Sequence, residues 1–473
     1  MKKVISGFKV YYLLYVLVAF TALLNEKSWM GAATLVLTAY GAVVGVYLLV
    51  QIIRKRQKIT NLVWIIAFLV SHVFSSLMMA KYGITDNIKE LFWLAFPMFV
   101  LYTASWQCTP DEIHKEIKLL SVIYVIYATV AGGVSLSMLS WGRDYNVVSP
   151  DGGIRVVGLK WGRLWGVFDD PNHGATILVV GIILAVYLII VTKNRLFKIL
   201  LALTIPVQYL YIVFSDSRTG EIALCVAILT GMGFWMYQRL HREQGGKQKK
   251  SGVIILTAVV ACALIVGSLG ASYGVKDAFN KYEKKRQAEI AAEKAKQEKK
   301  NTTKKPSQIG RKKDIEKDVS NGRLSIWQSG LELVETSPVY GVSFRNITNY
   351  AKAEVPDTYI VNTEYGGYYD SMHNSLVDIL VSQGMIGILI IGAMLVNTLL
   401  YLRRKWRYKN KDSFRLQAVC LSILLALGAG SMFLSMIFYL NSPQNYIFWL
   451  CFGYFMNSLS GIEEKKDSEE RNS

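Results

Sequence analysis

The sequence contains little cysteine and comparatively little acidic charge. Its five cysteines, among 473 residues, form neither a CxxC pair nor a Cys/His spacing, so neither a disulfide framework nor a zinc site is predicted. Asp and Glu number 34 against 53 Lys and Arg, which gives a formal net charge of +19. In a membrane protein such an excess marks cytoplasmic loops and contacts with anionic lipid, so we expect no nucleic-acid partner.

Several motifs of common enzyme and transporter classes are also missing. The predicted cytoplasmic segments contain no glycine-rich nucleotide loop, and no paired acidic residues spaced to hold a metal ion and a nucleotide sugar. No repeat of 20–50 residues and no pair of matching halves is visible, which argues against a duplicated transporter. We therefore expect a donor that is not a cytoplasmic nucleotide.

Long apolar runs, by contrast, recur along the chain, and 52% of its residues are hydrophobic. A bilayer-spanning helix needs about 20 apolar residues. The run that follows Lys2 and Lys3 lacks a clean small-residue cleavage site, so we interpret it as a first span and not as a signal peptide. The sequence thus predicts an all-α polytopic membrane protein with about twelve transmembrane helices. The predicted spans are 8–24, 29–53, 60–80, 91–107, 119–141, 174–192, 196–214, 220–237, 253–273, 375–401, 416–440 and 446–460.

The basic loops predict the orientation. Residues 54–58, 239–250 and 403–415 are rich in Lys and Arg and fall on one side of the membrane, which the positive-inside rule makes cytoplasmic. Both termini are then cytoplasmic. The predicted organisation is spans one to nine in 1–273, an extracytoplasmic subdomain in 274–372, spans ten to twelve in 373–460, and a cytoplasmic tail in 461–473.

The subdomain between spans nine and ten begins with a basic segment. Residues 281–313 hold 13 basic and 4 acidic side chains. This composition predicts a solvated helix followed by a linker; the alternative is a basic arm that attracts anionic lipid headgroups or a polyanionic glycan. Residues 321–338 then predict an amphipathic helix on or over the membrane mouth. Its apolar positions at helical spacing are Leu324, Trp327, Leu331 and Val334.

Two polar clusters lie at the predicted outer face in the first half of the chain. The first runs from Lys160 to His173, and its Arg163 offers a planar fork that suits a phosphate. Trp165 in the same cluster supplies a face for a sugar ring, although an interfacial aromatic belt is the alternative. The second is the turn 215–220, where Arg218 at the membrane edge suggests a functional site. Snorkelling to the headgroups, or a pair with a neighbouring carboxylate, would also satisfy Arg218.

Two further clusters lie in the second half. Gly322-Arg323 begins the amphipathic helix, and Asp370-Ser371-Met372-His373-Asn374 opens the tenth span. A histidine titrates near neutral pH, so His373 could orient a sugar hydroxyl or take its proton. A solvated Arg323 and a structural His373 are the alternatives.

These motifs resemble the O-antigen ligase and O-antigen polymerase superfamily of bacterial surface-glycan enzymes. His373-Asn374, nine residues, Gly384, two residues and Gly387 are similar to the family's pattern of His-Asn/Ser/Gln, nine residues, Gly, two residues and Gly/Thr/Tyr. Arg163 to Asn172 and Ser217-Arg218-Thr219-Gly220 are similar to its loop motifs, and Gly322-Arg323 with Trp327 is similar to the start of its extracytoplasmic helix. The resemblance covers roughly Arg155 to Gly387, except for the basic 281–313 segment.

The resemblance implies a GT-C-like, metal-independent membrane glycosyltransferase fold and a donor glycan on undecaprenyl diphosphate at the outer leaflet. It calls for no nucleotide, metal or flavin cofactor. It implies that Arg163, Arg218 and Arg323 bind the diphosphate, and that His373 orients or deprotonates the acceptor hydroxyl for inverting attack. Asn374 would hold the His ring or a sugar hydroxyl. Supplementary candidates are Lys160, Asn172, Trp165, Arg155 and Asp370. Membrane lipids, a chain-length regulator and a flippase are the expected partners, and the bacterial plasma membrane is the expected location.

Polymerase and ligase differ only in the acceptor. We favour a polymerase of capsular, exopolysaccharide or O-antigen-type repeats, because polymerases occur in bacteria with one or two membranes, whereas a lipid-core ligase needs an outer membrane. A secondary transporter or lipid flippase, and a receptor or scaffold that binds glycan without turnover, are the alternatives from other classes.

Overall fold

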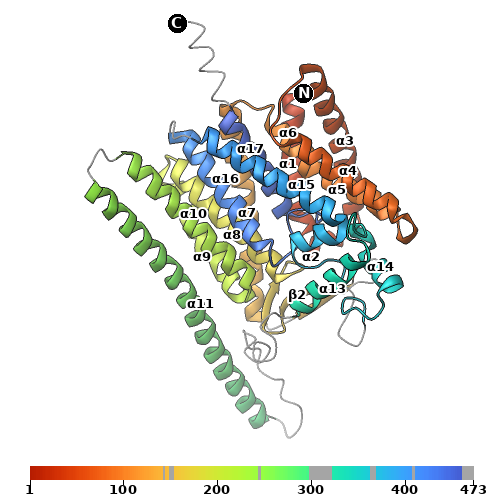
Figure 1. The fold of residues 1–473 in the computed structure, drawn as a ribbon. Helices are drawn as coiled ribbons and strands as arrows, with labels where there is room; N and C mark the ends of the chain where they lie inside the picture. The colour runs from red at the N-terminus through yellow and green to blue at the C-terminus, as the bar shows by residue number, and fades with distance from the viewer. Residues whose placement is uncertain are drawn as a thin grey trace. The chain divides into compact units, whose positions relative to one another are not determined.

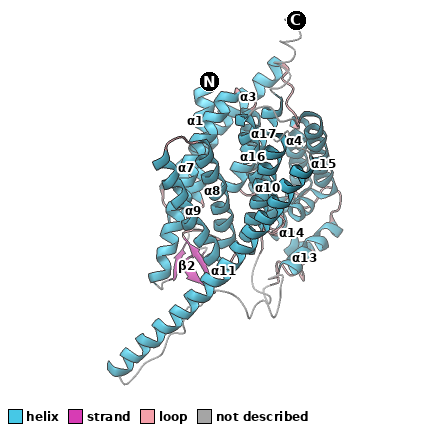
Figure 2. Ribbon diagram, turned by 90° about the vertical axis from the view of Figure 1, so that its left-hand side faces the viewer, coloured by secondary structure: helices cyan, strands magenta, loops and turns pink. Residues whose placement is uncertain are grey.

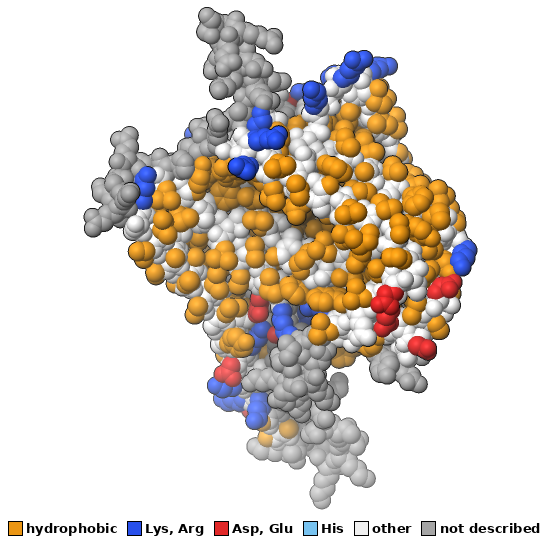
Figure 3. Space-filling model, viewed as in Figure 1, with side chains coloured by type: hydrophobic (Ala, Val, Ile, Leu, Met, Phe, Trp, Pro, Cys, Tyr) orange, Lys and Arg blue, Asp and Glu red, His pale blue; other side chains and the backbone are white. Residues whose placement is uncertain are grey.

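The computed structural model describes residues 1–141, 144–148, 154–242, 247–297, 322–362, 369–406 and 411–460 of the chain. Helices account for most of this part, and many of them are apolar enough to span a bilayer, so the protein is a helical, polytopic membrane protein as predicted. Eight of the described helices are long and apolar enough to cross a membrane. On the face shown in Figure 3, hydrophobic side chains cover the helices along most of their length and charged side chains lie toward the helix ends.

The chain divides into two compact units. Unit 1 comprises Met1–Ala19, Lys27–Ser121 and Asp318–Ser473, and unit 2 comprises Phe20–Glu26 and Val122–Lys317. The long helix α7 (Pro110–Trp141) begins in unit 1 and ends in unit 2.

Unit 1 holds the helices from both ends of the chain. In unit 1, α1 begins and α17 ends at the same end, and α13 and α14 lie at the opposite end (Figure 1). Its helices, besides the start of α7, are α1 (Lys2–Ala19), α3 (Trp29–Lys55), α4 (Leu62–Met78), η1 (Ala80–Tyr82), α5 (Thr85–Ala95), η2 (Phe96–Leu101), α6 (Tyr102–Ser105), α13 (Arg323–Thr336), η3 (Phe344–Asn346), α14 (Ile347–Glu354), α15 (Ser375–Lys405), α16 (Lys411–Gly430) and α17 (Pro443–Ser460).

Unit 2 combines long helices with a small sheet that the sequence analysis did not predict. The sheet is antiparallel with strand order β1-β2-β3, and it connects α7 to α8. Figure 2 shows its strands near one end of the unit. The elements, besides the end of α7, are α2 (Ala22–Asn25), β1 (Asp144–Val148), β2 (Ile154–Lys160), β3 (Arg163–Gly166), α8 (Pro171–Val191), α9 (Arg195–Ser215), α10 (Arg218–Arg242) and α11 (Lys247–Gln297).

Every predicted span coincides with helix over most of its length. Eight of them correspond to the helices that satisfy both length and composition for crossing a membrane, and the other four correspond to α1, α4, the α5–α6 run and α17, which are shorter or less apolar. The total of twelve spans therefore stays a prediction. The predicted tail 461–473 lies outside the described residues.

Two spans differ in detail from the prediction. Residues 416–440 were expected to be one helix, but α16 ends at Gly430 and the next residues form a loop. The loop takes part in the start of another helix, because Ser431 O accepts the N–H of Ser375 at 2.9 Å. The predicted span 91–107 contains the π-helix η2, where Pro97 lacks the N–H that a regular helix would use.

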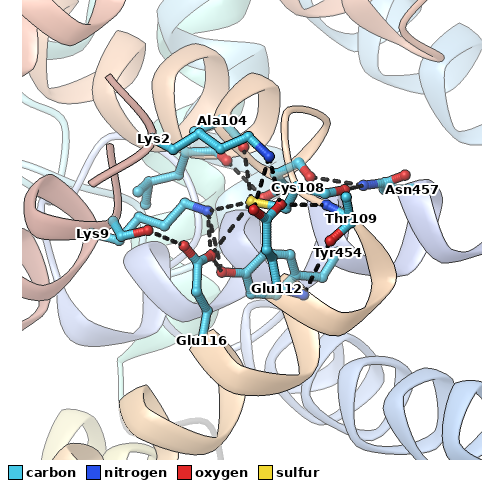
Figure 4. A network of polar contacts seen from close by, with 12 residues as sticks. Lys2, Lys9, Ala104, Cys108, Thr109, Glu112, Glu116, Tyr454 and Asn457 are labelled. Atoms are coloured by element: carbon cyan, nitrogen blue, oxygen red, sulfur yellow. Dashed lines mark hydrogen bonds and ion pairs between the residues drawn. The ribbon is translucent and has the colours of Figure 1, made fainter. Parts of the chain in front are cut away.

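A buried ion pair joins three helices at the end of unit 1 where α1 begins (Figure 4). Lys9 is 1% exposed, and its Nζ donates to Glu116 Oε2 of α7 at 2.6 Å. Tyr454 of α17 donates its hydroxyl to the same carboxylate oxygen at 2.5 Å, and Ser6 donates to the other oxygen. A cavity of about 200 Å³ lies beside this pair and is also lined by Glu112. Charges at this depth persist when they are paired and hydrogen-bonded.

α8 forms the core of unit 2 because small residues let its neighbours approach. A Cβ on Gly174 would lie 2.3 Å from the Tyr211 hydroxyl, and a Cβ on Gly181 would lie 2.2 Å from Gln208 Oε1, both on α9. A Cβ on Gly220 of α10 would lie 2.6 Å from the Cβ of Ala175. Close packing of α9 and α10 on α8 fixes the turn between them, which carries one of the predicted motifs.

Candidate functional site

The outer loop predicted after the fifth span forms a β-hairpin. Trp161 and Gly162 make its two-residue turn, between the paired residues Lys160 and Arg163. Both turn residues have positive φ, 52° and 68°, as a type I′ turn requires. Lys160 Nζ lies 5.0 Å from the Trp161 ring centre, and that ring lies 5.6 Å from Trp165. The hairpin tip thus gathers a cation and two aromatic rings, which suits contact with a sugar or an interface.

Arg163 connects the two predicted motifs of unit 2. The residue is 8% exposed; its Nε donates to the carbonyl of Ser215 at 2.8 Å, and its Nη2 donates to Asn172 Oδ1 at 2.7 Å. Ser217 donates its hydroxyl to the same Asn172 oxygen at 3.0 Å. The hairpin loop and the Ser217–Gly220 turn are therefore brought together, and the Arg163 fork joins them.

Each of these two motifs also starts a helix. Asp170 caps α8, because its Oδ1 accepts the N–H of Asn172 at 2.7 Å and that of His173 at 3.1 Å. Burial would raise the pKa of Asp170, but His173, Arg163 and the backbone donors together hold the pKa below its ordinary value. Ser217 caps α10 in the same way, because its Oγ accepts a backbone N–H at 3.1 Å.

Arg218 is the first residue of α10. A pair between Arg218 and Asp216 or Glu221 was one of the alternatives expected for this turn. Both carboxylates contact Lys276 of α11, at 2.7 Å and 3.6 Å respectively. Arg218 therefore lies in a turn whose acidic neighbours have a cation of their own.

In unit 1, His373 lies directly before α15. Its backbone φ is +49°, which is uncommon for a residue with a side chain. The Tyr369 ring lies 6.0 Å from the His373 ring at 81°, in an edge-to-face contact. Asn374 Oδ1 accepts the N–H of Leu376 at 2.9 Å and that of Val377 at 3.3 Å, so Asn374 caps α15. Its amide oxygen is therefore engaged with the helix start.

The backbone just before His373 is held by buried groups. The N–H of Met372 donates to Asp378 Oδ1 at 2.6 Å, and Ser435 donates to the other carboxylate oxygen. Trp327 of α13 donates its indole N–H to the carbonyl of Met372 at 3.0 Å. Trp327, which the sequence analysis singled out at the helix start, thus helps to fix the position of His373.

Arg323 is the first residue of α13, after Gly322 with a φ of +80°. Its guanidinium carbon lies 5.9 Å from the Phe433 ring centre, in the loop after α16. α13 occupies most of the predicted 321–338 helix, but its buried face differs from the predicted stripe. Ile326 and Leu333 are buried, whereas the stripe residues Leu324 and Leu331 are 63% and 54% exposed.

The glycines of the His-Asn-Gly pattern have a structural explanation. Gly384 breaks α15 with φ 61° and ψ −156°, a conformation essentially restricted to glycine. A Cβ there would lie 2.4 Å from the carbonyl of Val339, and a Cβ on Gly341 would lie 2.5 Å from Val381 O. The two backbones touch at this point, and Val342 N donates to Val381 O at 2.8 Å. The segment after α13 is therefore inserted against the break in α15.

A buried polar cluster that the sequence analysis missed holds this inserted segment. Arg345 Nε and Nη2 lie 2.7 and 2.6 Å from Glu90 Oε2, and Glu90 is fully buried. Asn87 Oδ1 accepts the Ser343 hydroxyl at 2.7 Å and the Arg345 N–H at 3.0 Å. Burial raises the pKa of Glu90 to about 7, although Arg345 draws it down. The available signal was an acidic residue directly before an apolar span.

The structure groups the predicted site residues by unit. Arg163, Asn172 and the Ser217–Gly220 turn meet in unit 2, with Lys160 and Trp165 on the same hairpin. In unit 1, Asp370 is exposed and lies on the segment that leads into His373. Arg155 lies in β2, and its side chain lies outside the described residues. Among the residues that the structure describes, no three His, Cys, Asp or Glu side chains are close enough to share a metal ion.

The protein is thus a helical membrane protein in which Arg218 and Arg323 begin two helices and His373 lies directly before a third. Residues 202–392 match the sequence model of a family described as O-antigen ligase. The match confirms the resemblance for this segment, which is about two fifths of the chain, and supports membership of the O-antigen ligase and polymerase superfamily. Members of that family are glycosyltransferase-type membrane enzymes that act on lipid-linked glycans. The matched segment contains Arg218, Arg323 and His373, while the Arg163 motif precedes it. No curated protein matches the chain.

Proposed function

We propose that the protein is a metal-independent, inverting glycosyltransferase of the bacterial plasma membrane that polymerises oligosaccharide repeats carried on undecaprenyl diphosphate. The repeats would belong to a capsular, exopolysaccharide or O-antigen-type polymer. The donor is used at the outer leaflet, both termini are cytoplasmic, and twelve spans form a GT-C-like fold in this proposal.

One observation carries the proposal. Arg218 and Arg323 are each the first residue of a helix, α10 and α13. A helix N-terminus carries about half a positive charge, so it favours acidic side chains and disfavours arginine. An arginine added there strengthens an anion site that the N–H groups of the first turn already provide. Two such arginines within the matched family segment support binding of a diphosphate.

The proposed reaction assigns one role to each group. Arg163, Arg218 and Arg323 bind the diphosphate and stabilise the negative charge that grows on it as it leaves. The acceptor hydroxyl oxygen forms the new bond to the anomeric carbon while the bond from that carbon to the diphosphate oxygen breaks. His373 orients the hydroxyl and accepts its proton. The remaining proposed substrate contacts are Lys160, Asn172, Asn374, Trp165, Asp370 and Arg155.

Ligation of a finished chain to a lipid or cell-wall acceptor is the second candidate. The description of the matching family as O-antigen ligase favours it. Both reactions use the same donor chemistry and differ in the acceptor. We place polymerisation first because its acceptor, another lipid-linked repeat, is present in the same membrane as the enzyme.

The test uses a strain in which the gene is deleted and then restored as wild type or as His373→Ala. Surface glycans are resolved on gels, and lipid-linked intermediates are measured by mass spectrometry. Single repeats on undecaprenyl diphosphate without a ladder indicate a polymerase, and accumulation of long untransferred lipid-linked chains indicates a ligase. His114→Ala, in α7 and outside every motif, is the control, and immunoblots of membranes check that the variants are present.

Two outcomes would overturn the proposal. Unchanged glycans and intermediates in the deletion strain itself would leave transport as the leading function. A His373→Ala protein that restores normal glycans would show that His373 takes no part in the chemistry. Arg218→Ala, tested alongside, should behave like His373→Ala, because the proposed transfer reaction needs both residues. A transporter or scaffold would instead tolerate at least one of the two changes.

A further inference from the structure

The ninth predicted span continues as one long helix into the basic segment. α11 runs for 51 residues from Lys247 to Gln297, well past the predicted end at residue 273, and it extends beyond the sheet of unit 2 (Figures 1 and 2). Residues 281–297 of the basic segment thus belong to α11, and 298–313 lie outside the described residues. A lysine on this helix, just beyond the predicted span, reaches the motif turn.

Lys276 lies between the two carboxylates that flank Arg218. Its Nζ lies 2.7 Å from Asp216 Oδ1 and 3.6 Å from Glu221 Oε1. Ser272, one turn earlier on α11, donates its hydroxyl to Glu221 at 3.1 Å. The side chains of Lys276 and Asp216 are 15% and 19% exposed, so water screens this pair only in part. Phe279 extends the contact, because its ring lies 5.2 Å from that of Phe214 on α9.

The charges of this turn bear on anion binding. Asp216 precedes Arg218 by two residues and Glu221 follows it by three, so two negative side chains surround the arginine in the sequence. With Lys276 the four side chains sum to zero charge, and without it they sum to −1. A diphosphate that approaches an uncompensated carboxylate at a partly shielded site is repelled.

We propose that Lys276 is a positioning residue for the anion site: it neutralises Asp216 and Glu221, so that the turn carrying Arg218 can accept the diphosphate of the lipid-linked donor. Lys276 acts through the two carboxylates and does not contact the reacting atoms. The inference rests on the proposed function and adds to it a residue from outside the four motifs.

The test measures transfer by the purified full-length protein in liposomes, with undecaprenyl-diphosphate-linked repeats from the deletion strain as donor. Lys276→Gln should raise KM for the donor about tenfold, with kcat changed by less than about twofold, because the lost charge weakens donor binding. Raising the salt concentration should reduce the difference in KM between Lys276→Gln and the wild-type protein, since salt screens the repulsion between the carboxylates and the diphosphate. Lys276→Arg keeps the charge and should stay near wild type.

A double variant separates electrostatics from structure. Asp216 has a φ of +47°, a conformation that asparagine adopts as readily, so Asp216→Asn removes the charge with little strain. Lys276→Gln combined with Asp216→Asn should bring KM back to within about threefold of wild type. If Lys276 touched the diphosphate, or merely fastened α11, this double variant would stay impaired.

Lys281→Gln is the matched control. Lys281 lies five residues further along α11, is 78% exposed and pairs with Asp277 on the helix surface, so its loss should leave KM unchanged. A Lys276→Gln protein with wild-type KM, or a raised KM that Asp216→Asn does not restore, would overturn the inference. If the wild-type protein transfers nothing from the lipid-linked donor, the proposed function itself fails. That outcome is distinguished from the two above because it appears without any substitution.

Discussion

Lys2 and Lys9 provide a direct comparison of an exposed and a buried ion pair. They lie seven residues apart on α1, and they pair with Glu112 and Glu116, four residues apart on α7. Lys2 and Glu112 are 67% and 39% exposed, whereas Lys9 and Glu116 are 1% and 15% exposed. The perturbation is Lys9→Met, which keeps the side-chain length and removes the charge.

The expected cost follows from what Lys9 leaves behind. Its Nζ is within hydrogen-bond distance of Glu116 at 2.6 Å, Tyr454 at 3.3 Å and Cys108 at 3.4 Å, which uses all three of its donors. Removal of one partner of a buried pair costs about 3–5 kcal/mol, because the other charge stays buried and uncompensated. Glu116 keeps the hydrogen bonds from Tyr454 and Ser6 and some exposure, so we expect a destabilisation of about 3 kcal/mol.

The assay is thermal denaturation of the detergent-solubilised protein, followed by the loss of monodisperse material in size-exclusion chromatography. Lys9→Met should lower the midpoint by several degrees, and Lys2→Met should leave it nearly unchanged because an exposed pair contributes little. Lys9→Met combined with Glu116→Gln should recover most of the loss, since no buried charge then remains. Equal midpoints for the two single variants would refute the reasoning, and a double variant as unstable as Lys9→Met would assign the effect to packing.

Three further predictions concern motif residues. Gly384→Ala should prevent folding, because the new Cβ would lie 2.4 Å from the Val339 carbonyl, whereas Gly392→Ala on the same helix has no neighbour within 4 Å and should be tolerated; the yield of monodisperse protein measures both. Asn374→Ala should cost about 1 kcal/mol as a lost helix cap, while Asn374→Asp keeps the cap; thermal midpoints check this, and activity lost by both would indicate a substrate contact. Arg163→Lys should reduce polymer formation in the complementation assay, because an ammonium cannot reach Ser215 and Asn172 as the fork does, and full activity would contradict this role.

The sequence predicts the helices well because their signal is local. An apolar run of about 20 residues specifies a span whatever its neighbours are. The contacts of the site are not local. Arg345 and Glu90 are 255 residues apart, and Lys276 and Asp216 are 60 apart. Composition reports only that such charges exist, so neither pair could be predicted.

α13 shows that a periodic apolar pattern does not identify the face of a helix that packs against protein. Leu324 and Leu331 predict an apolar stripe, but the helix buries the face that contains Gly330. A Cβ on Gly330 would lie 2.9 Å from Val377, so the missing side chain is what lets α13 approach α15. Small residues count for little in a hydrophobic pattern, yet they determine which face packs. The exposed leucines remain available to the membrane interface predicted for this helix.

The motif residues share conformations and positions that are unfavourable for folding alone. An arginine in the first turn of a helix costs about 0.3–1 kcal/mol, and Arg218 and Arg323 both occupy that position. His373 adopts a positive φ that costs about 1 kcal/mol for a residue with a Cβ. A glycine or an acidic residue at these places would fold at lower cost. A bound anion would offset the cost of placing Arg218 and Arg323 at helix N-termini. A fixed backbone at His373 would aim its ring at a substrate hydroxyl. These residues are therefore better explained by ligand chemistry than by stability.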